Sequence, residues 1–355
     1  MPYLLILLIG LLGGCVTLDS RDEAPAGTTV SGPKVTPVFY ATCRKPSSKS
    51  GVYFGSERAE LSYGSLDISI PARHLVGRKE APSLLKFQYS EDHSKHIAIQ
   101  WHNSYFHNAF YHYLNKALDQ SGGKLMIFVH GYNVEFSDAA RSLGQFATDL
   151  KYNPGVLFSW PSQGSLTGYT VDATNAEWAQ SLFLDFLKDI LDNTQAREIQ
   201  IVGHSMGTRL ITRGMATLAA DRSREDMQRF GNIVLLAPDI DADVFRRDLA
   251  PRIESAQIPV TLYASSGDKA LIASKAFNGY HRAGDSGEEL VIVPGVETID
   301  ASEVAGGLLG HTYFAEDPRI IGDIYALLQA NQRADQRFAL APVQSKDGRY
   351  WVFRK

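Results

Sequence analysis

Short apolar runs alternate with longer segments of helical spacing over residues 124–329. The runs at 125–129 and 155–160 are almost wholly apolar, as expected of strands buried on both faces of a sheet. Over 176–191 the apolar residues follow one helical face and predict a helix. The same alternation predicts further strands at 199–202, 233–237, 260–264 and 290–293, and further helices over 205–220 and 318–329.

This order of elements predicts an α/β fold with a mostly parallel central sheet and helices on both faces. The N-terminal third has a different pattern, because short strand-like runs follow one another there without helices between them. These runs, at 38–41, 51–54, 66–70 and 97–101, suggest antiparallel strands on one side of the sheet. We find no internal repeat and no second linker, and therefore expect residues 36–355 to form one domain.

The first residues predict a secretory signal. Residues 3–12 are apolar apart from Gly10, and the run ends in Gly13, Gly14 and Cys15. About ten apolar residues are too few to cross the ~30 Å hydrocarbon core of a membrane. Small residues followed directly by cysteine resemble a bacterial lipoprotein signal. This resemblance implies that residues 1–14 are removed and that Cys15 becomes the lipidated first residue.

One feature argues against that expectation, and two others extend it. No Lys or Arg occurs in residues 1–3, so the usual basic start is missing and an uncleaved N-terminus with an incidental cysteine is the alternative. Residues 15–35 are small and polar and predict a flexible tether behind the anchor. Val16 stands where an aspartate would suggest retention in the inner membrane, so the resemblance favours the outer membrane, with the protein facing the periplasm.

Composition excludes several classes of function. Lys and Arg number 35 against 39 Asp and Glu, which gives a net charge of -4 and argues against a nucleic-acid partner. Two cysteines exclude a disulfide scaffold and a cysteine-rich metal site. Cys43 is expected to be a small buried residue. Three histidines recur at intervals of five, a spacing that matches no zinc site and favours packing; they are His102, His107 and His112.

The strongest candidate for chemistry is Ser205. Residues 203–207 read Gly-His-Ser-Met-Gly and match the pattern G-x-S-x-G between a predicted strand and a predicted helix. This placement is typical of a nucleophile elbow, where a tight turn raises the serine hydroxyl above the sheet. Glycines at 203 and 207 would relieve clashes in that turn. The alternative is an ordinary serine cap in a glycine-flanked turn.

An acyl-transfer serine also needs two N–H groups that bind the developing oxyanion. Met206 supplies one by its position after the nucleophile. Residues 130–133 follow the strand at 125–129 and resemble the His-Gly loop of α/β hydrolases, in which the N–H of Tyr132 would be the second donor. Gly131 would let this loop approach the serine closely, and we interpret His130 as bracing the loop rather than acting as a base.

The base and the acid should follow Ser205 in the chain, in the order acid and then histidine. His311 lies between the last predicted strand and the last helix and is favoured over His281, which lies in a polar, glycine-rich segment. Asp268 follows the strand at 260–264 and is the favoured acid. Asp241 and Asp239, one strand earlier, are the alternatives, and the carboxylates that are not used are expected to cap helices.

Seven segments together resemble a bacterial family of α/β hydrolases that is catalogued chiefly as a domain of unknown function. They are TPVFYAT at 36–42 with Arg44, YFGSER at 53–58, FVHGYN at 128–133, FSWP at 158–161, GHSMG at 203–207, LAPD at 236–239 and GHTYF at 310–314. The resemblance covers most of residues 36–330. It implies the hydrolase fold and places Asp268 and His311 at the acid and base positions, but it implies no substrate. Cys43 departs from the pattern, which has a polar residue before Arg44.

The sequence therefore predicts a membrane-anchored serine hydrolase that cleaves a carboxylic ester or thioester of a small molecule or lipid, without metal or cofactor. A peptidase or amidase is the alternative within the enzyme class. A lipoprotein that uses the fold as a binding or assembly module, with an idle serine, is the alternative outside it. Four aromatic residues near the predicted mouth suggest an apolar pocket or a buried core; they are Tyr132, Phe136, Trp160 and Tyr169.

Overall fold

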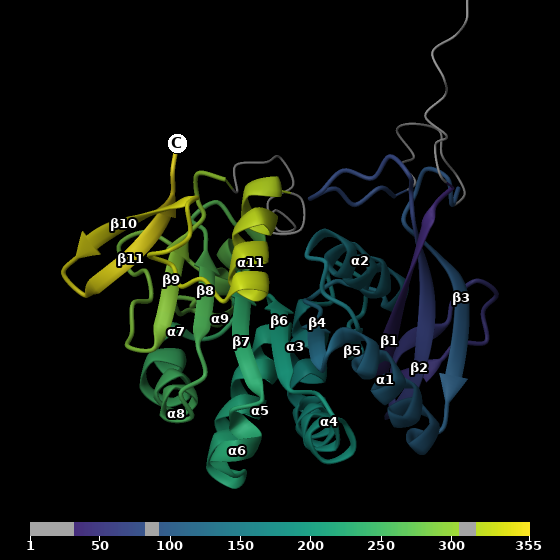
Figure 1. Cartoon of the computed structure of the whole chain (residues 1–355). Coiled ribbons are helices and arrows are strands. Elements are labelled where there is room, and N and C mark those ends of the chain that lie inside the picture. Colours follow the sequence, from purple (N-terminus) through teal and green to yellow (C-terminus); the bar gives the residue numbers. More distant parts are fainter. Residues whose placement is uncertain (1–31, 82–91, 305–316) are drawn as a thin grey trace, which may run out of the picture. The chain divides into compact units, whose positions relative to one another are not determined.

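A sheet of eleven strands runs through the computed structural model, which describes residues 32–81, 92–304 and 317–355 (Figure 1). Its order is β10-β11-β9-β8-β7-β6-β4-β5-β1-β2-β3. In chain order the strands are β1 (Lys34–Pro46), β2 (Phe54–Ile70), β3 (Ala98–Tyr105), β4 (Lys124–Val129), β5 (Gly155–Ser159), β6 (Glu198–His204), β7 (Phe230–Leu236), β8 (Val260–Ala264), β9 (Val296–Asp300), β10 (Leu340–Ser345) and β11 (Gly348–Phe353).

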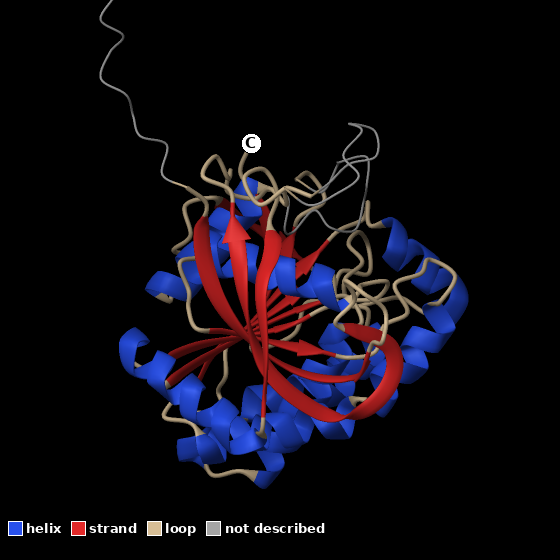
Figure 2. Cartoon of the chain, turned by 90° about the vertical axis from the view of Figure 1, so that its right-hand side faces the viewer, coloured by secondary structure: helices blue, strands red, loops and turns tan. Residues whose placement is uncertain are grey.

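Helices cover both faces of this twisted sheet (Figure 2). One face packs against α1, α3, α4, α5 and α8, and the opposite face against α2 and α11. The helical elements are α1 (His107–Ser121), α2 (Phe136–Asp149), α3 (Tyr169–Trp178), α4 (Gln180–Asn193), α5 (Gly207–Asp221), α6 (Arg224–Met227), α7 (Ala242–Val244), the π-helical turn η2 (Phe245–Leu249), α8 (Ala250–Ser255), α9 (Lys269–Asn278) and α11 (Pro318–Ala330).

The centre of the sheet is parallel, and its strands are buried on both sides. Strands β1, β5, β4, β6, β7, β8 and β9 pair in parallel, whereas β2 and β3 are added antiparallel beside β1. In β4 the side chains of Leu125, Ile127 and Val129 pack on one face, and those of Met126 and Phe128 pack on the other. The predicted fold class, including its antiparallel N-terminal strands, is confirmed.

Three predicted elements differ from the structure. The run at 66–70 is the end of one long strand, β2, which begins at Phe54, the last residue of the run at 51–54, and whose half-exposed middle carries no apolar pattern. The helix predicted over 176–191 is divided between α3 and α4, because Ala179 has ψ −5° and interrupts the helical backbone. The strand predicted at 290–293 is wrong: Leu290 and Val291 are buried, but the segment pairs with no strand, and the strand forms after the turn at Gly295 (φ +75°), as β9.

The C-terminal hairpin of β10 and β11 was not predicted. It extends the sheet beyond β9, and its two strands lie half-exposed along one edge (Figure 1). Cys43 is fully buried in β1, as predicted, and burial raises the pKa of its thiol to about 12. No helix within the described ranges has the length and apolar character needed to cross a membrane.

Candidate active site

Ser205 lies in the sharp turn between β6 and α5 and has a left-handed backbone, with φ +50°. A Cβ atom at Gly203 would lie 2.1 Å from Cδ1 of Ile211, and one at Gly207 would lie 2.3 Å from the carbonyl oxygen of His130. Only glycine fits at both positions without displacing its neighbours. A non-glycine residue at positive φ stores backbone strain, which is typical of functional sites.

The surrounding backbone holds this turn in place. The N–H of Ser205 donates to the carbonyl of Leu236 at the end of β7 (2.9 Å). The carbonyl of Ser205 accepts the N–H groups of Thr208 (3.1 Å) and Asp239 (3.3 Å). Hydrogen bonds to the following helix and to the end of the neighbouring strand therefore fix the backbone of Ser205. Ser205 is 2% exposed.

The loop that follows β4 lies directly against Ser205. Strand β4 pairs with β6 so that Val129 lies opposite Gly203, which brings the two following loops together. A Cβ atom at Gly131 would lie 2.9 Å from Cβ of Ser205, so a larger residue would push the loop away. The N–H groups of Tyr132 and Met206 donate no hydrogen bond within the described part of the chain. Among the described residues these two amides have no acceptor, which makes them candidate donors to an oxyanion.

Arg44 holds this loop in place through hydrogen bonds from its guanidinium group. Its residue is 1% exposed, and its guanidinium uses all five N–H donors, each on an uncharged acceptor. Burial lowers the pKa of Arg44 to about 10. The acceptors are Ser159 Oγ (2.9 Å), the carbonyl oxygens of Gly55 (3.1 Å), Ser162 (2.9 Å) and Val134 (2.7 Å), and Nε2 of His130 (3.3 Å).

His130 belongs to the same buried network. Its ring stacks on Trp160 with centroids 5.0 Å apart, and Nδ1 lies 2.8 Å from the carbonyl oxygen of Gly131. Burial and the charge of Arg44 lower the pKa of His130 to about 3, so the ring is neutral near pH 7. A neutral ring that accepts from Arg44 at Nε2 can donate from Nδ1 to Gly131, which orients the loop.

Asp172 in α3 holds the other end of the loop. Its carboxylate accepts the N–H of Asn133 (3.1 Å), the hydroxyl of Ser162 (2.6 Å) and the N–H of Gln163 (2.7 Å). Asn133 has φ +57°, so this bond secures a second left-handed residue. The sequence did not single out Arg44 or Asp172 as site residues. The one available signal was a charged residue that ends an otherwise apolar strand, at Arg44.

The favoured acid, Asp268, is fully buried after β8, and β8 is separated from β6 by one strand. Its Oδ1 accepts the N–H groups of Ala270 (3.0 Å) and Leu271 (3.1 Å) and caps α9. Asp241 caps α7 in the same way, with its Oδ1 accepting two N–H groups of that helix. Helix capping was expected only of the carboxylates that are not used in catalysis. Both Asp268 and Asp241 cap a helix, so capping does not distinguish them.

Asp239 lies in a dense network of charged and hydroxyl partners. Its carboxylate contacts Arg209 (2.9 Å) and Arg282 (2.8 Å) and also accepts the hydroxyls of Tyr169 (2.9 Å) and Ser274 (2.5 Å). Burial opposes its ionisation, but the two arginines lower the pKa of Asp239 below its usual value. This carboxylate is therefore a charged structural centre rather than a cap.

Of the two candidate histidines, the structure describes His281 but not His311. His311 lies outside the described residues, in the segment between β9 and α11, and so does Cys15 near the N-terminus. Nδ1 of His281 lies 3.0 Å from Glu289, 3.3 Å from Asp285 and 3.3 Å from Nζ of Lys275. The structure thus places His281 in a charged cluster that follows α9.

The aromatic residues at the predicted mouth divide into two groups. Phe136 and Trp160 are 1% and 0% exposed and belong to the core. The rings of Tyr132 and Tyr169 meet edge to face, with centroids 5.5 Å apart. No group of three His, Cys, Asp or Glu side chains that could hold a metal ion occurs among the residues with described positions.

Comparison with solved structures finds similar folds at low identity. A fungal esterase structure from Rhizomucor miehei is 12% identical, with 84% of this chain and 85% of that chain covered and a TM-score of 0.37. A predicted CIB-like hydrolase from Thermoplasma acidophilum is 16% identical, with 66% and 93% covered and a TM-score of 0.37. Carboxylesterase CesB from Bacillus subtilis is 11% identical, with 59% and 85% covered and a TM-score of 0.33.

No curated protein matches the sequence at a significant level. A family model described as an alpha/beta hydrolase of unknown function (DUF900) matches residues 106–331, which is more than half of the chain. This match confirms the resemblance stated from the sequence motifs, and it agrees with the parallel sheet, the elbow at Ser205 and the loop at Gly131. The chain belongs to the DUF900 family of alpha/beta hydrolases.

Proposed function

We propose that this α/β hydrolase is a serine esterase that cleaves a carboxylic ester or thioester. Ser205 would be the nucleophile, His311 the general base and Asp268 the carboxylate that orients His311. The observation that carries the proposal is the geometry around Ser205. A strained serine stands between a strand and a helix, and the glycine loop at Gly131 passes against its Cβ atom.

The proposed reaction has two halves. Oγ of Ser205 attacks the acyl carbon while His311 takes the hydroxyl proton, and the N–H groups of Tyr132 and Met206 bind the oxyanion. The intermediate collapses to an acyl-enzyme as His311 returns the proton to the leaving alcohol or thiol. Water, deprotonated by His311, then attacks the acyl carbon, and the carboxylic acid leaves Ser205 with its proton restored. No metal or cofactor enters either half.

The choice of Asp268 rests on the competing bonds of the alternatives. Asp239 is engaged by two arginines and two hydroxyls, so a histidine would have to displace one of these partners. Asp241 lies in the loop that begins α7. Asp268 and Asp241 each make two capping bonds at Oδ1, so Asp268 is preferred by its place directly after β8. The chain order Ser205, Asp268, His311 is also that of the fold.

The direct test is turnover of p-nitrophenyl butyrate by single variants of the full chain. Ser205→Ala and His311→Ala should each lower kcat by about 10⁴-fold or more, because the triad acts as a unit. Asp268→Asn should lower kcat by about 10²- to 10⁴-fold. His281→Ala and Asp241→Asn are the matched controls and should retain activity. Retained turnover in Ser205→Ala, with an unchanged melting temperature, would contradict the proposal.

Labelling separates the enzyme from an idle scaffold. An activated serine should react with a fluorophosphonate probe, and the label should disappear in Ser205→Ala. If the wild-type chain is not labelled, the protein would be a binding or assembly module instead. Comparing butyryl ester with butyryl anilide distinguishes an esterase from an amidase, because only an amidase would cleave the anilide at a comparable rate.

We also propose a lipid anchor at Cys15, which would place the hydrolase in the bacterial cell envelope, facing the periplasm and most simply on the outer membrane. Support comes from the short apolar run and the glycines before the cysteine. Incorporation of labelled palmitate into the full chain should be lost in Cys15→Ala. Labelling that persists in this variant would exclude Cys15 as the lipid site. Small-molecule and lipid acyl esters would both be accessible to an enzyme held there.

A further inference from the structure

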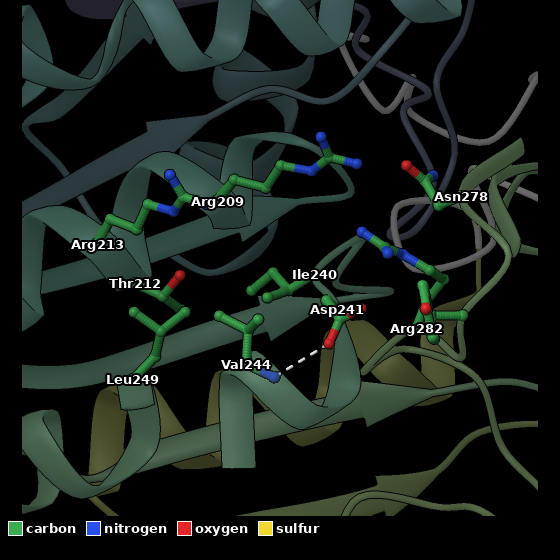
Figure 3. A pocket seen from close by; sticks show the side chains of 10 residues that line it. Arg209, Thr212, Arg213, Ile240, Asp241, Val244, Leu249, Asn278 and Arg282 are labelled. Atoms are coloured by element: carbon green, nitrogen blue, oxygen red, sulfur yellow. Dashed lines mark hydrogen bonds between the residues drawn. The ribbon is translucent and has the colours of Figure 1, made fainter. Parts of the chain in front are cut away.

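A cavity of about 300 Å³ lies on the flank of α5, the helix that follows Ser205 (Figure 3). Arg209 and Arg213 extend into it from α5, one helical turn apart, and Arg282 enters from the segment that follows α9. Ile240, Val244 and Leu249 line the opposite side. The cavity therefore combines three guanidinium groups with an apolar wall.

The arginines are held rigidly by a carboxylate behind them. Nε of Arg209 donates to the carbonyl oxygen of Asp239 (2.6 Å), and Nη2 donates to Oδ2 (2.9 Å). Nε of Arg282 donates to Oδ1 of Asp239 (2.8 Å), and Nη2 donates to its carbonyl oxygen (3.2 Å). The side chains of Arg209 and Arg282 are 18% and 5% exposed. Two guanidinium groups are thus oriented before any ligand arrives.

Each of these arginines keeps N–H donors that no described residue accepts. Nη1 of Arg209 and Nη1 of Arg282 make no hydrogen bond to any residue that the structure describes. Arg213 donates from Nη1 to Gln180 (3.3 Å) and has no other side-chain bond within the same ranges. Charged donors at the wall of a cavity favour an anionic acceptor, because charge-assisted bonds are the stronger ones.

The charge balance of the cavity also favours an anion. Its three guanidinium groups are opposed by two carboxylates, those of Asp239 and Asp241. The carboxylate of Asp239 is consumed by the two arginines that it holds. Oδ1 of Asp241 turns toward the first turn of α7, where it accepts the N–H of Val244 (3.0 Å; Figure 3). Positive charge is left over on the side of Arg209 and Arg213.

We propose that this cavity binds an organic anion. A carboxylate or phosphate group would be held by Arg209, Arg213 and Arg282, and a short hydrocarbon part would lie on Ile240, Val244 and Leu249. The site is separate from the nucleophile, because Ser205 is not among the residues that line the cavity. It goes beyond the proposed esterase activity and does not depend on it.

Binding can be measured by calorimetry on the full chain carrying Ser205→Ala, where no turnover interferes. The probes are heptanoate, hexyl phosphate and 1-hexanol, which share a hexyl chain and differ in the head group. At least one anion should bind with a dissociation constant on the order of 1 mM or below, and at least tenfold more tightly than 1-hexanol. The tighter of the two anions identifies the head group.

Arg213→Gln removes the most exposed of the three guanidinium groups without touching Asp239. It should weaken the preferred anion about fivefold and leave 1-hexanol unchanged. Arg73→Gln, an exposed arginine outside the cavity, is the matched control and should change neither constant. Equal affinity for the alcohol and both anions would overturn the proposal. So would an anion affinity that Arg213→Gln and Arg73→Gln leave equally unchanged.

Discussion

Arg44 and Arg337 are both buried, 1% and 2% exposed, yet they have opposite surroundings. Arg44 donates only to uncharged acceptors around the loop that follows β4. Arg337 follows α11 and forms ion pairs with Asp323 (2.8 Å) and Glu297 (2.9 Å), far from the elbow along the sheet. The first arginine organises a loop, and the second joins secondary-structure elements.

The difference appears in the ionisation of the two groups. Burial lowers the pKa of Arg44 to about 10, and no carboxylate among the described residues contacts its guanidinium to offset this. Burial also disfavours the charge of Arg337, but Tyr263, Asp323 and Glu297 more than offset it and raise its pKa. A buried charge without a counter-ion costs stability. Its retention at Arg44 indicates that positioning of the loop, rather than stability, is what this arginine provides.

The largest expected effect on stability is that of Arg337→Met. The substitution leaves Asp323 without its cation and should lower the free energy of unfolding by about 3–5 kcal/mol. Because Arg337 does not contact the loop at Gly131, kcat for p-nitrophenyl butyrate should be unchanged at a temperature where the variant is folded. Urea unfolding and a parallel rate measurement check both parts. A large loss of kcat in fully folded protein would show that the two regions are coupled.

Arg44→Lys should have a smaller effect on stability and a larger one on rate. Lysine keeps the charge but has three donors instead of five, so two of the acceptors, such as His130 and Val134, lose their bonds. We expect a loss of about 3 kcal/mol in unfolding free energy and at least a tenfold fall in kcat, with little change in KM. The exposed Arg73→Lys is the control. An Arg44→Lys enzyme that is less stable but fully active would reduce Arg44 to a structural role.

The smallest expected effect is a loss of folding stability at acidic pH. The pKa of His130 is about 3 in the folded chain, against an ordinary value near 6.5, so below pH 6.5 the unfolded chain binds more protons. The stabilisation is complete above pH 6.5 and is lost as the pH falls toward 3. Between pH 6.5 and 5 the loss should approach about 2 kcal/mol. His130→Asn should remove this component, whereas His112→Asn, at an exposed position in α1, should not. Equal pH dependence in both variants would contradict the assignment.

The sequence predicted best what is determined locally. Strands β4 to β8 are apolar on both faces, and the elbow at Ser205 is contained in five consecutive residues, so both could be recognised without knowing the fold. The middle of β2 and the hairpin of β10 and β11 are half-exposed and carry no such pattern.

Contacts between distant segments could not be predicted in this way. Arg44 lies 86 residues before His130 and 90 before Val134, and Asp172 lies 39 residues after Asn133. No periodicity or motif connects residues so far apart. The prediction of a strand at 290–293 was wrong for a related reason, because a buried segment is apolar whether or not its backbone pairs in a sheet.

The family model begins at residue 106, whereas Arg44 lies in β1, well before it. A fragment that begins at this boundary would keep Ser205, Asp268 and His311 but would lose Arg44 and Gly55, which leaves the other four acceptors of Arg44 without their shared cation. Truncation at that boundary should therefore yield a chain that still contains the three residues of the proposed triad but has lost the arginine that holds the loop at Gly131 in place. Strand β1, which precedes the family model, is thus an integral part of the unit that shapes this loop and cannot be treated as a dispensable extension.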